Sequence, residues 1–288
     1  SPVQNAPVSD IQAEIPVTGT FTGTSAGTGC GTTQSMFQYS EAVTTDTNGD
    51  LLTDLNDGYN DFPSSANTET FVAGLGYALF VRGNLLTTSA LWNLRGPINQ
   101  GNVTPVTLPS TFTSSGNAAN DGWNLVGNPY PSTIDWNAAA GWTKTNVGGT
   151  IYVRDNGTDQ FATWNGAVGV NGGTRYIPTG QAFWIQATNT PTLIANENVK
   201  VPGQQTTFFR ELALTDLLRV TLRRGDLRDE TVIHFRDDAK TDYDAETDSR
   251  KFNNSTFNLS SILTSGESLA INSSPFACSE PVRLNITN

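Results

Sequence analysis

Short runs in which apolar and polar residues alternate recur along the chain, and they predict β-strands. In residues 217–223, every second side chain from Leu218 to Leu222 is apolar, so one face of an extended chain would be apolar. Residues 231–236 form a second such run after a turn at 225–230, and the two runs predict a hairpin. Turns rich in Gly and Asn separate the runs throughout, which is typical of a β-sandwich or barrel. The only stretch that favours a helix is short, near Trp136–Ala140.

A weak internal repeat is present in the first 205 residues. The segment Gly74–Val81 is similar to Gly180–Gln186, since each has a glycine turn, a small residue and then an aromatic strand. An aromatic strand followed by an acidic turn precedes each segment, at Met36–Glu41 and at Ile151–Asp155. The offset between aromatic residues is 106 in the first pair and 115 in the second. The unequal offsets indicate two related β units with loop insertions rather than a short-period solenoid.

The two units differ at their starts. The second unit opens with a predicted strand and turn, Gly122–Pro131, whereas the counterpart in the first unit would lie before Ser1. We therefore expect the chain to begin inside a unit, with an unpaired sheet edge that invites another strand. Two explanations stay open: a longer protein has been cut, or a neighbouring subunit supplies the strand and so builds a filament or surface layer.

Residue usage changes near position 205. All six Trp and nearly all Gly precede it, whereas the remainder is richer in charge. We predict an all-β protein of tandem β-sandwich or jelly-roll-like domains. Residues 1–205 would form a Trp- and Gly-rich region of two units, about 1–115 and 116–205. Residues 206–288 would form a smaller β-sandwich domain that runs into another module.

Composition excludes several classes of protein. The net charge of −11 over 288 residues argues against nucleic-acid binding, which needs a basic surface. No apolar run approaches the roughly 18–20 residues of a membrane helix, so we expect no membrane insertion. Charged residues make up only 15% of the chain, against about a quarter in an average domain. A polar, Lys-poor β protein of this kind is common outside the cell.

Catalytic motifs are absent from the sequence. The only histidine, His234, alternates with Val232 and Arg236 and is more typical of a structural or surface residue than of a base. No nucleophile elbow, zinc-ligand pair or phosphate-binding glycine loop is present. A glycoside hydrolase needs only two carboxylates across a cleft, so this alternative stays open although no pair stands out.

One loop has the spacing of a calcium site. Oxygen-bearing side chains occupy positions 1, 3, 5, 9 and 12 of a 12-residue segment, which resembles an EF-hand loop although Leu51 replaces the usual glycine. The candidate ligands are Asp46, Asn48, Asp50, Asp54 and Asp57. The alternative is a solvated Asn-Gly turn. A second acidic run, 237–248, fits no ligand template, so we expect a solvated loop there.

Two further sets of residues are candidates for binding or cross-linking. Trp136, Trp142 and Trp164 flank polar turns, where an exposed ring could stack on a sugar; packing inside the sandwich is the alternative. Cys30 and Cys278 lie near opposite ends, and an even number of cysteines in an extracellular protein permits a disulfide. Two free thiols, or bonds to neighbouring molecules, are equally compatible with the spacing.

Several segments resemble large Bacteroidota proteins that leave the cell by type IX secretion. The most specific is the run Gly122–Trp136, and the likeness covers roughly residues 35–288. The other matching segments are Trp142–Asn146, Thr150–Val153, Ile177–Trp184, Glu230–Arg236, Asp242–Ala245 and Leu269–Asn272. The resemblance implies a surface adhesin or structural β module, and it transfers no catalytic residue and no ligand.

Together, the residues and the resemblance lead to one expectation. We expect a non-catalytic, extracellular or cell-surface module, structural or adhesive, whose partners are copies of itself, adjacent modules or surface glycans. A carbohydrate-binding module is the main alternative, and a glycoside hydrolase fragment the second.

Overall fold

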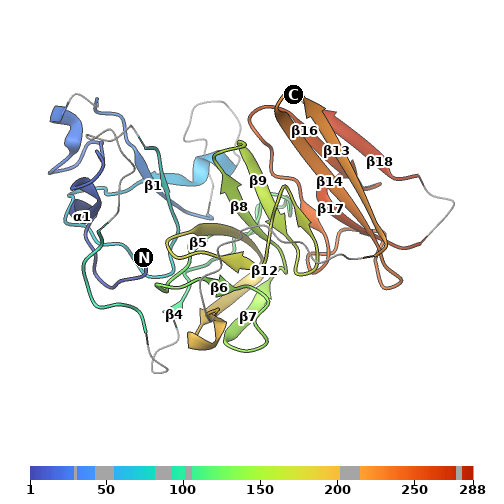
Figure 1. The fold of residues 1–288 in the computed structure, drawn as a ribbon, viewed down its shortest axis with the longest axis horizontal. Coiled ribbons are helices and arrows are strands. Elements are labelled where there is room, and N and C mark those ends of the chain that lie inside the picture. Colours follow the sequence, from blue (N-terminus) through green and yellow to red (C-terminus); the bar gives the residue numbers. More distant parts are fainter. Residues whose placement is uncertain are drawn as a thin grey trace.

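The computed structural model describes residues 1–28, 31–42, 55–81, 93–100, 106–201, 215–276 and 281–287. The all-β prediction is confirmed, because strands in several sheets dominate the described residues and α1 (Val8–Gln12) is their only α-helix. The strands form three groups in chain order, which we call the first unit, the second unit and the C-terminal sheet (Figure 1). Three short 3-10 helices also occur in the described part of the chain: η1 (Ser25–Thr28), η2 (Leu55–Gly58) and η3 (Glu197–Val199).

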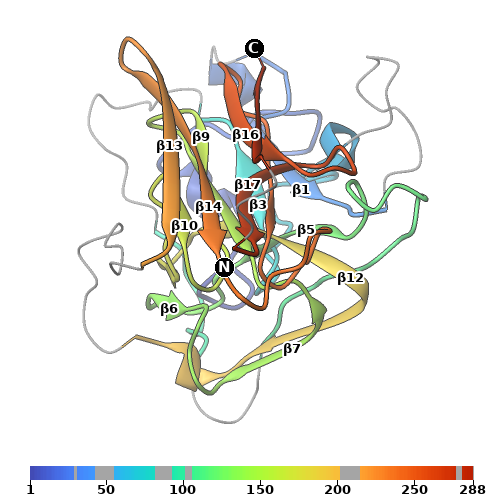
Figure 2. The same cartoon turned by 90° about the vertical axis from the view of Figure 1, so that its right-hand side faces the viewer.

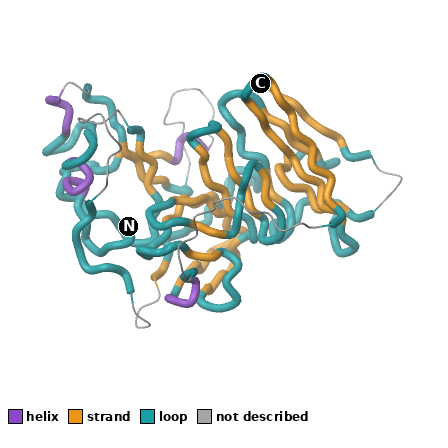
Figure 3. The backbone as a smooth tube through the Cα atoms, in the orientation of Figure 1, coloured by secondary structure: helices purple, strands orange, loops and turns teal. Residues whose placement is uncertain are grey.

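The first unit is a small sheet packed against a long N-terminal arm. Its strands β1 (Met36–Tyr39), β2 (Tyr59–Asp61) and β3 (Tyr77–Leu79) are antiparallel, with β1 in the centre. Loops make up most of the arm, as the tube in Figure 3 shows. The arm contributes Val8 and Ile11 of α1 to a core that also contains Met36 and Phe71. Because these two residues are three apart, they share one face of the helix.

The second unit is built around β12, the longest strand. Its first half pairs with β5 and β8, and its second half with β7 and β4. The pairing register shifts between Ala187 and Thr192, so one chain run belongs to two ladders and the sheet curls into half a barrel. The strands of the unit are β4 (Val106–Thr107), β5 (Trp123–Gly127), β6 (Ile134–Asp135), β7 (Trp142–Val147), β8 (Ile151–Asp155), β9 (Gln160–Trp164), β10 (Gly169–Val170), β11 (Tyr176–Ile177) and β12 (Ala182–Ala195).

The two faces of β12 meet two different clusters of buried residues. Phe183 and Ile185 point into the interior of the half-barrel, where they pack with Trp136 and Trp164. Trp184 lies on the opposite face, in an aromatic cluster that reaches outside the unit. The alternation follows from the two-residue side-chain period of a strand. Both faces are therefore covered, which explains the run of apolar residues here.

The predicted repeat is present as a repeated strand pairing. In the first unit, Phe37 of β1 lies opposite Ala78 of β3. In the second unit, Tyr152 of β8 lies opposite Trp184 of β12. Tyr152 follows Phe37 by 115 residues, and Trp184 follows Ala78 by 106, the same two offsets found in the sequence. The two units thus share a register as well as a sequence pattern.

The sequence repeat predicts that one edge of the first unit lacks a strand. The second unit pairs with the start of this edge. Leu75, just before β3, forms an antiparallel bridge with Val126 of β5. The backbone N–H of Gly76 donates to the carbonyl of Leu125, and the N–H of Gly127 donates to that of Gly74. β5 thus lies between β12 and the segment just before β3, whereas β3 itself pairs only with β1 among the described residues. The expectation of an unpaired edge is corrected at this bridge and not along β3.

The C-terminal sheet has six strands, all after residue 216. The proposed boundary near residue 205 falls in residues 202–214, which lie outside the described residues. Val232 and Ile271 of the sheet pack on Val168 and Val170 of the second unit, and Figure 2 views the molecule from this side. The strands are β13 (Leu217–Arg224), β14 (Leu227–Phe235), β15 (Ser249–Arg250), β16 (Asn258–Ile262), β17 (Ser268–Ser274) and β18 (Arg283–Thr287).

The sequence pattern is right about the hairpin and wrong about the helix. β13 and β14 pair antiparallel from Leu217↔His234 to Arg224↔Leu227, as the alternation predicted. The stretch Trp136–Ala140 contains no helix, because it is a turn after β6. Its tryptophan is held inside the half-barrel, and that tertiary contact overrides the local preference of the alanines.

Candidate functional site: an aromatic cleft between three sheets

A cleft of about 680 Å³ opens where the first unit, the second unit and the C-terminal sheet meet. It is larger than two other cavities among the described residues, which have volumes of about 290 and 160 Å³. Each group of strands contributes part of its wall, so the cleft exists only when all three are folded together. The described lining residues are Leu55, Asn56, Tyr59, Ala119, Asn120, Trp123, Arg154, Phe161, Trp184, Arg250, Lys251, Phe252, Asn253, Ser265, Gly266, Glu267 and Ser268.

Aromatic rings form the floor of the cleft. Trp123 of β5 and Trp184 of β12 are buried, while Tyr59 of β2 keeps 36% of its surface exposed. Tyr59 meets Trp184 edge-on, with ring centroids 6.3 Å apart. Such edge-to-face pairs are favourable because the positive rim of one ring faces the negative face of the other. Tyr59 is thus the ring that the first unit presents to solvent at this site.

Phe252 of the C-terminal segment inserts among the rings of the second unit. It stacks on Phe161, with centroids 4.7 Å apart and planes at 24°, and it approaches Trp123 at 4.4 Å. Contacts with Tyr152 and Trp184 complete its surroundings. Phe252 lies two residues after Arg250, the last residue of β15, and both residues line the cleft.

The charged side chains that line the cleft are paired. Arg154 pairs with Asp159 and lies over the Phe161 ring. Arg250 Nη1 donates to Glu267 Oε1 at 2.7 Å, and its guanidinium stacks on Tyr243. Burial raises the pKa of the Tyr59 hydroxyl, and the positive charge of Arg154 acts in the opposite direction. The phenol is therefore protonated at neutral pH and can donate a hydrogen bond.

The tryptophans proposed as a sugar platform are structural. Trp136 is 1% exposed and Trp164 is 6% exposed. Their indole N–H groups donate inside the protein, to the Gly149 carbonyl and to Asn137 Oδ1. Trp142 is half-buried and packs edge-on against Trp136. The expectation of a platform on these three rings is corrected, because the half-barrel interior covers the faces of two and part of the third.

Most of the proposed calcium ligands cannot be placed. Asp46, Asn48, Asp50 and Asp54 lie outside the described residues, and Asp57 is buried within η2. Within the described parts of the chain, no group of three or more His, Cys, Asp or Glu side chains is placed to hold a metal ion. Calcium binding by this loop stays a prediction.

The remaining candidates are resolved in part. Cys30 and Cys278 lie outside the described residues, so the disulfide also stays a prediction. The described acidic run 237–248 contains ion pairs, from Arg236 to Asp238 and from Lys240 to Asp244. His234 Nδ1 is buried without a hydrogen-bond partner among the described residues, and burial lowers the pKa of its ring.

The residues of the cleft were not found from the sequence. Tyr59, Phe161 and Phe252 come from distant segments, and no local spacing links them. One signal was available for Phe252, since it is a lone aromatic residue in the polar run Arg250–Asn254. An isolated aromatic side chain of this kind either becomes exposed or anchors the segment elsewhere, and here it anchors.

Comparison with known proteins gives a family and no named relative. No curated protein and no solved structure matches the chain. No helix among the described residues is both long enough and apolar enough to span a membrane. A family model described as a domain of unknown function (DUF8693) matches residues 14–288. The chain therefore belongs to the DUF8693 family.

Proposed function

We propose that this chain is a non-catalytic adhesive module that binds carbohydrate in the aromatic cleft between its three sheets. The observation that carries the proposal is the cleft itself, about 680 Å³ with an aromatic floor and a polar rim. Cavities of several hundred Å³ that combine apolar walls with a few polar groups are typical ligand sites. The module acts outside the cell, as part of a Bacteroidota surface protein exported by type IX secretion, as the sequence resemblance implies.

The chemistry of the lining favours a sugar over an apolar ligand. A sugar ring has apolar C–H faces and a rim of hydroxyl groups. Tyr59 offers an exposed ring, and two amides, those of Asn120 and Asn253, offer both donors and acceptors. Arg154 adds a planar set of donors at the rim. A wholly apolar ligand would cover the side-chain amides of Asn120 and Asn253 without offering a hydrogen bond, which costs binding free energy.

The carboxylates of the cleft support binding rather than hydrolysis. Glu267 is the acidic residue in the described lining, and Arg250 holds it in an ion pair. A glycoside hydrolase uses two carboxyl groups about 5–10 Å apart, one of which must carry a proton. No second Asp or Glu accompanies Glu267 in the described lining, so the pair that hydrolysis requires is missing there.

The test is binding of soluble glycans by calorimetry, after a glycan array has identified a candidate. Tyr59→Ala should weaken binding at least about tenfold, which corresponds to about 1.4 kcal/mol. Phe276→Ala is the matched control, since Phe276 is an exposed aromatic residue outside the cleft lining, and it should bind like the unchanged chain. Equal affinities for the two variants, or no glycan bound by the unchanged chain, would contradict the proposal.

Assembly with a neighbouring module is a second function that one observation favours. Within the described residues β18 pairs only with β16, so its other edge is free to accept a strand. Leu284 and Ile286 of β18 are 47% and 60% exposed. Ile286→Lys should abolish any concentration-dependent self-association measured by sedimentation, whereas a monomer at all concentrations would remove this second function.

A further inference from the structure

A buried lysine, a buried carboxyl group and a buried amide meet between the second unit and the C-terminal sheet. Lys251 Nζ donates to Asp229 Oδ2 at 2.5 Å, and the two side chains are 4% and 0% exposed. Asn171 Nδ2 donates to the other oxygen of the same carboxyl group, Oδ1, at 2.9 Å. One carboxyl group thus bridges an amine and a side-chain amide, away from water.

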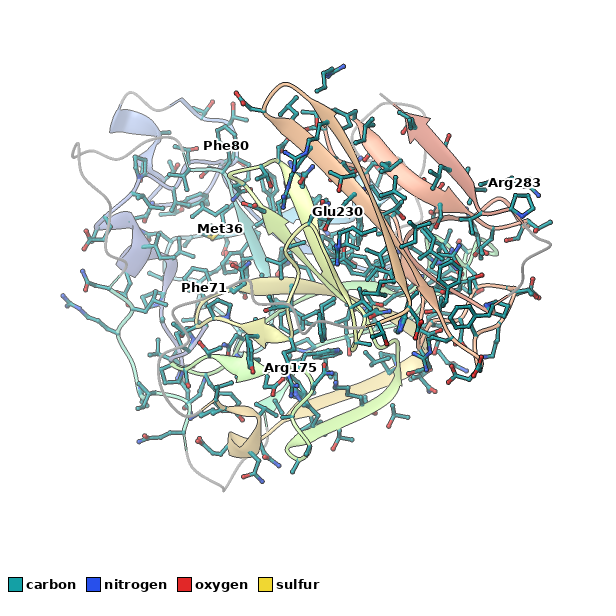
Figure 4. The ribbon with its side chains drawn as sticks, turned by 45° about the vertical axis from the view of Figure 1, so that its right-hand side comes forward. Met36, Phe71, Phe80, Arg175, Glu230 and Arg283 are labelled. Carbon is teal, nitrogen blue, oxygen red and sulfur yellow. The ribbon has the colours of Figure 1, made fainter. Side chains whose placement is uncertain are left out.

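Surrounding contacts hold each of the three groups in place. The backbone N–H of Asn171 donates to Glu230 Oε1 at 2.5 Å, and Glu230 is itself paired with Arg219. Asn171 adopts a positive φ of 50° after β10. The backbone N–H of Leu259 donates to Asp229 Oδ2 at 2.7 Å. Figure 4 labels Glu230 on β14, beside the strands of the second unit.

Burial of Lys251 and Asp229 costs free energy if the two side chains form only an ion pair. Two charges removed from water lose hydration that their mutual attraction only partly replaces. Burial lowers the pKa of Lys251, and the negative charge of Asp229 acts in the opposite direction. A buried lysine that sheds its proton is a nucleophile. The side-chain amide of Asn171, which donates to the same carboxyl group, is the matching electrophile.

We infer that Lys251 and Asn171 become joined by an intramolecular isopeptide bond. Transfer of the ammonium proton to Asp229 gives a neutral amine and a protonated carboxyl group. The bond from Nζ to Cγ of Asn171 forms and the bond from Cγ to Nδ2 breaks. Asp229 takes a second proton from Nζ on one oxygen and gives one to Nδ2 from the other, so that nitrogen leaves as ammonia. The ammonia then takes the proton that remains on Asp229 and departs as ammonium, which regenerates the carboxylate. No oxidant or further reactant is needed.

The hydrogen bonds suit this route. The oxygen that faces the amine and the oxygen that faces the leaving nitrogen belong to one carboxyl group. Asn171 Oδ1 is buried and accepts no hydrogen bond from a described residue, so the amide is bonded through its nitrogen. The new bond would join β10 of the second unit to the segment after β15, across the contact between the two groups of strands.

The decisive measurement is the intact mass of the full chain of residues 1–288 under denaturing conditions. We expect a mass lower than the sequence mass by one ammonia. After digestion, a branched peptide should contain both Asn171 and Lys251, and trypsin should not cleave after Lys251. The full sequence mass would overturn the inference. A loss of one water would also overturn it, because the bond would then lie between Lys251 and Asp229.

Three variants separate the bond from other losses of mass. Lys251→Met and Asp229→Asn should each show the full mass of their own sequence, the first without the amine and the second without the proton relay. Lys240→Met is the matched control, because Lys240 also pairs with an aspartate but is 65% exposed, and it should keep the deficit. A deficit that persists in Lys251→Met contradicts the assignment. The measurement on the unchanged chain decides the question even where a variant fails to fold.

Discussion

The ring of Tyr39 meets the ring of Trp184 edge-on, with centroids 4.5 Å apart and planes at 80°. Tyr39 ends β1 of the first unit, and Trp184 lies near the start of β12 in the second. Phe252 of the C-terminal segment approaches the same tryptophan at 5.9 Å. One indole therefore contacts all three groups of strands, and we expect them to unfold together.

Removal of the Phe252 ring should test this joint unfolding. Phe252→Ala empties the space between Phe161 and Trp123, and it should lower the free energy of unfolding by about 3 kcal/mol. Urea unfolding followed by circular dichroism would measure the change. The control Phe276→Ala removes an exposed ring and should cost about 1 kcal/mol or less. A loss of equal size in the two variants would show that Phe252 is not an anchor.

Gly122 should tolerate no side chain. Its φ is +75°, and a Cβ atom there would overlap the carbonyl oxygen of Ala187. The same two residues are hydrogen-bonded, since the Ala187 N–H donates to the Gly122 carbonyl at 2.7 Å. We expect Gly122→Ala to lower the free energy of unfolding by more than about 3 kcal/mol.

Gly225→Ala separates the cost of the backbone conformation from the cost of the steric overlap. Gly225 also has a positive φ, +62°, but a Cβ atom would meet nothing within 4 Å. Only the backbone conformation should then contribute, about 1–2 kcal/mol. Chemical unfolding of both variants measures the difference, and equal losses would contradict the role of the close approach to Ala187.

Because of Asp248, the free energy of unfolding should rise as the solution becomes mildly acidic. Burial raises the pKa of its carboxyl group from 3.8 to about 6, and hydrogen bonds from the backbone of Asp244 and Ser273 act in the opposite direction. Between these two values the folded chain binds more protons than the unfolded chain, so its stability rises as the pH falls from about 6 to about 4. The gain relative to Asp248→Asn should reach about 3 kcal/mol.

Urea unfolding at several pH values between 7 and 4 measures this gain. Asp238→Asn serves as the control, because Asp238 is exposed and the Arg236 guanidinium lowers the pKa of its carboxyl group. The rise between pH 6 and pH 4 should persist in that variant. Parallel curves for the unchanged chain and Asp248→Asn would show that the buried carboxyl group does not titrate in this range.

Calcium should raise the melting temperature if the loop of residues 46–57 binds it. The double variant Asp46→Ala with Asp50→Ala removes two of its oxygen ligands and should abolish the shift. Asp237→Ala with Asp238→Ala changes a similar number of charges in the second acidic run and should leave the shift in place. Differential scanning calorimetry with calcium and with a chelator would measure it, and no shift in the unchanged chain would exclude the site.

The strands and the repeat could be predicted because they depend on local patterns. Alternation of apolar residues marks β13 and β14, and the aromatic segments around Phe37 and Tyr152 mark the repeat. The side of a strand that becomes covered depends instead on distant elements. Trp136 begins a polar turn after β6, yet the half-barrel encloses it.

The cleft and the buried lysine cluster could not be predicted for the same reason. Tyr59, Trp184 and Phe252 occur far apart in the chain, and only the packing of three sheets brings them together. Asn171, Asp229 and Lys251 are likewise separated, and each alone is an ordinary polar residue in a polar segment. Their chemistry arises from sharing one buried site.

The place of Phe252 in the chain has a consequence for synthesis. Translation produces Trp123, Phe161 and Trp184 well before Phe252, which follows Trp184 by 68 residues. During that interval the nascent chain lacks the ring that packs on these three side chains, and its aromatic surface is open to water. Exposed surfaces of this kind are prone to aggregation. The unfinished chain is therefore expected to need a chaperone until its last strands are made.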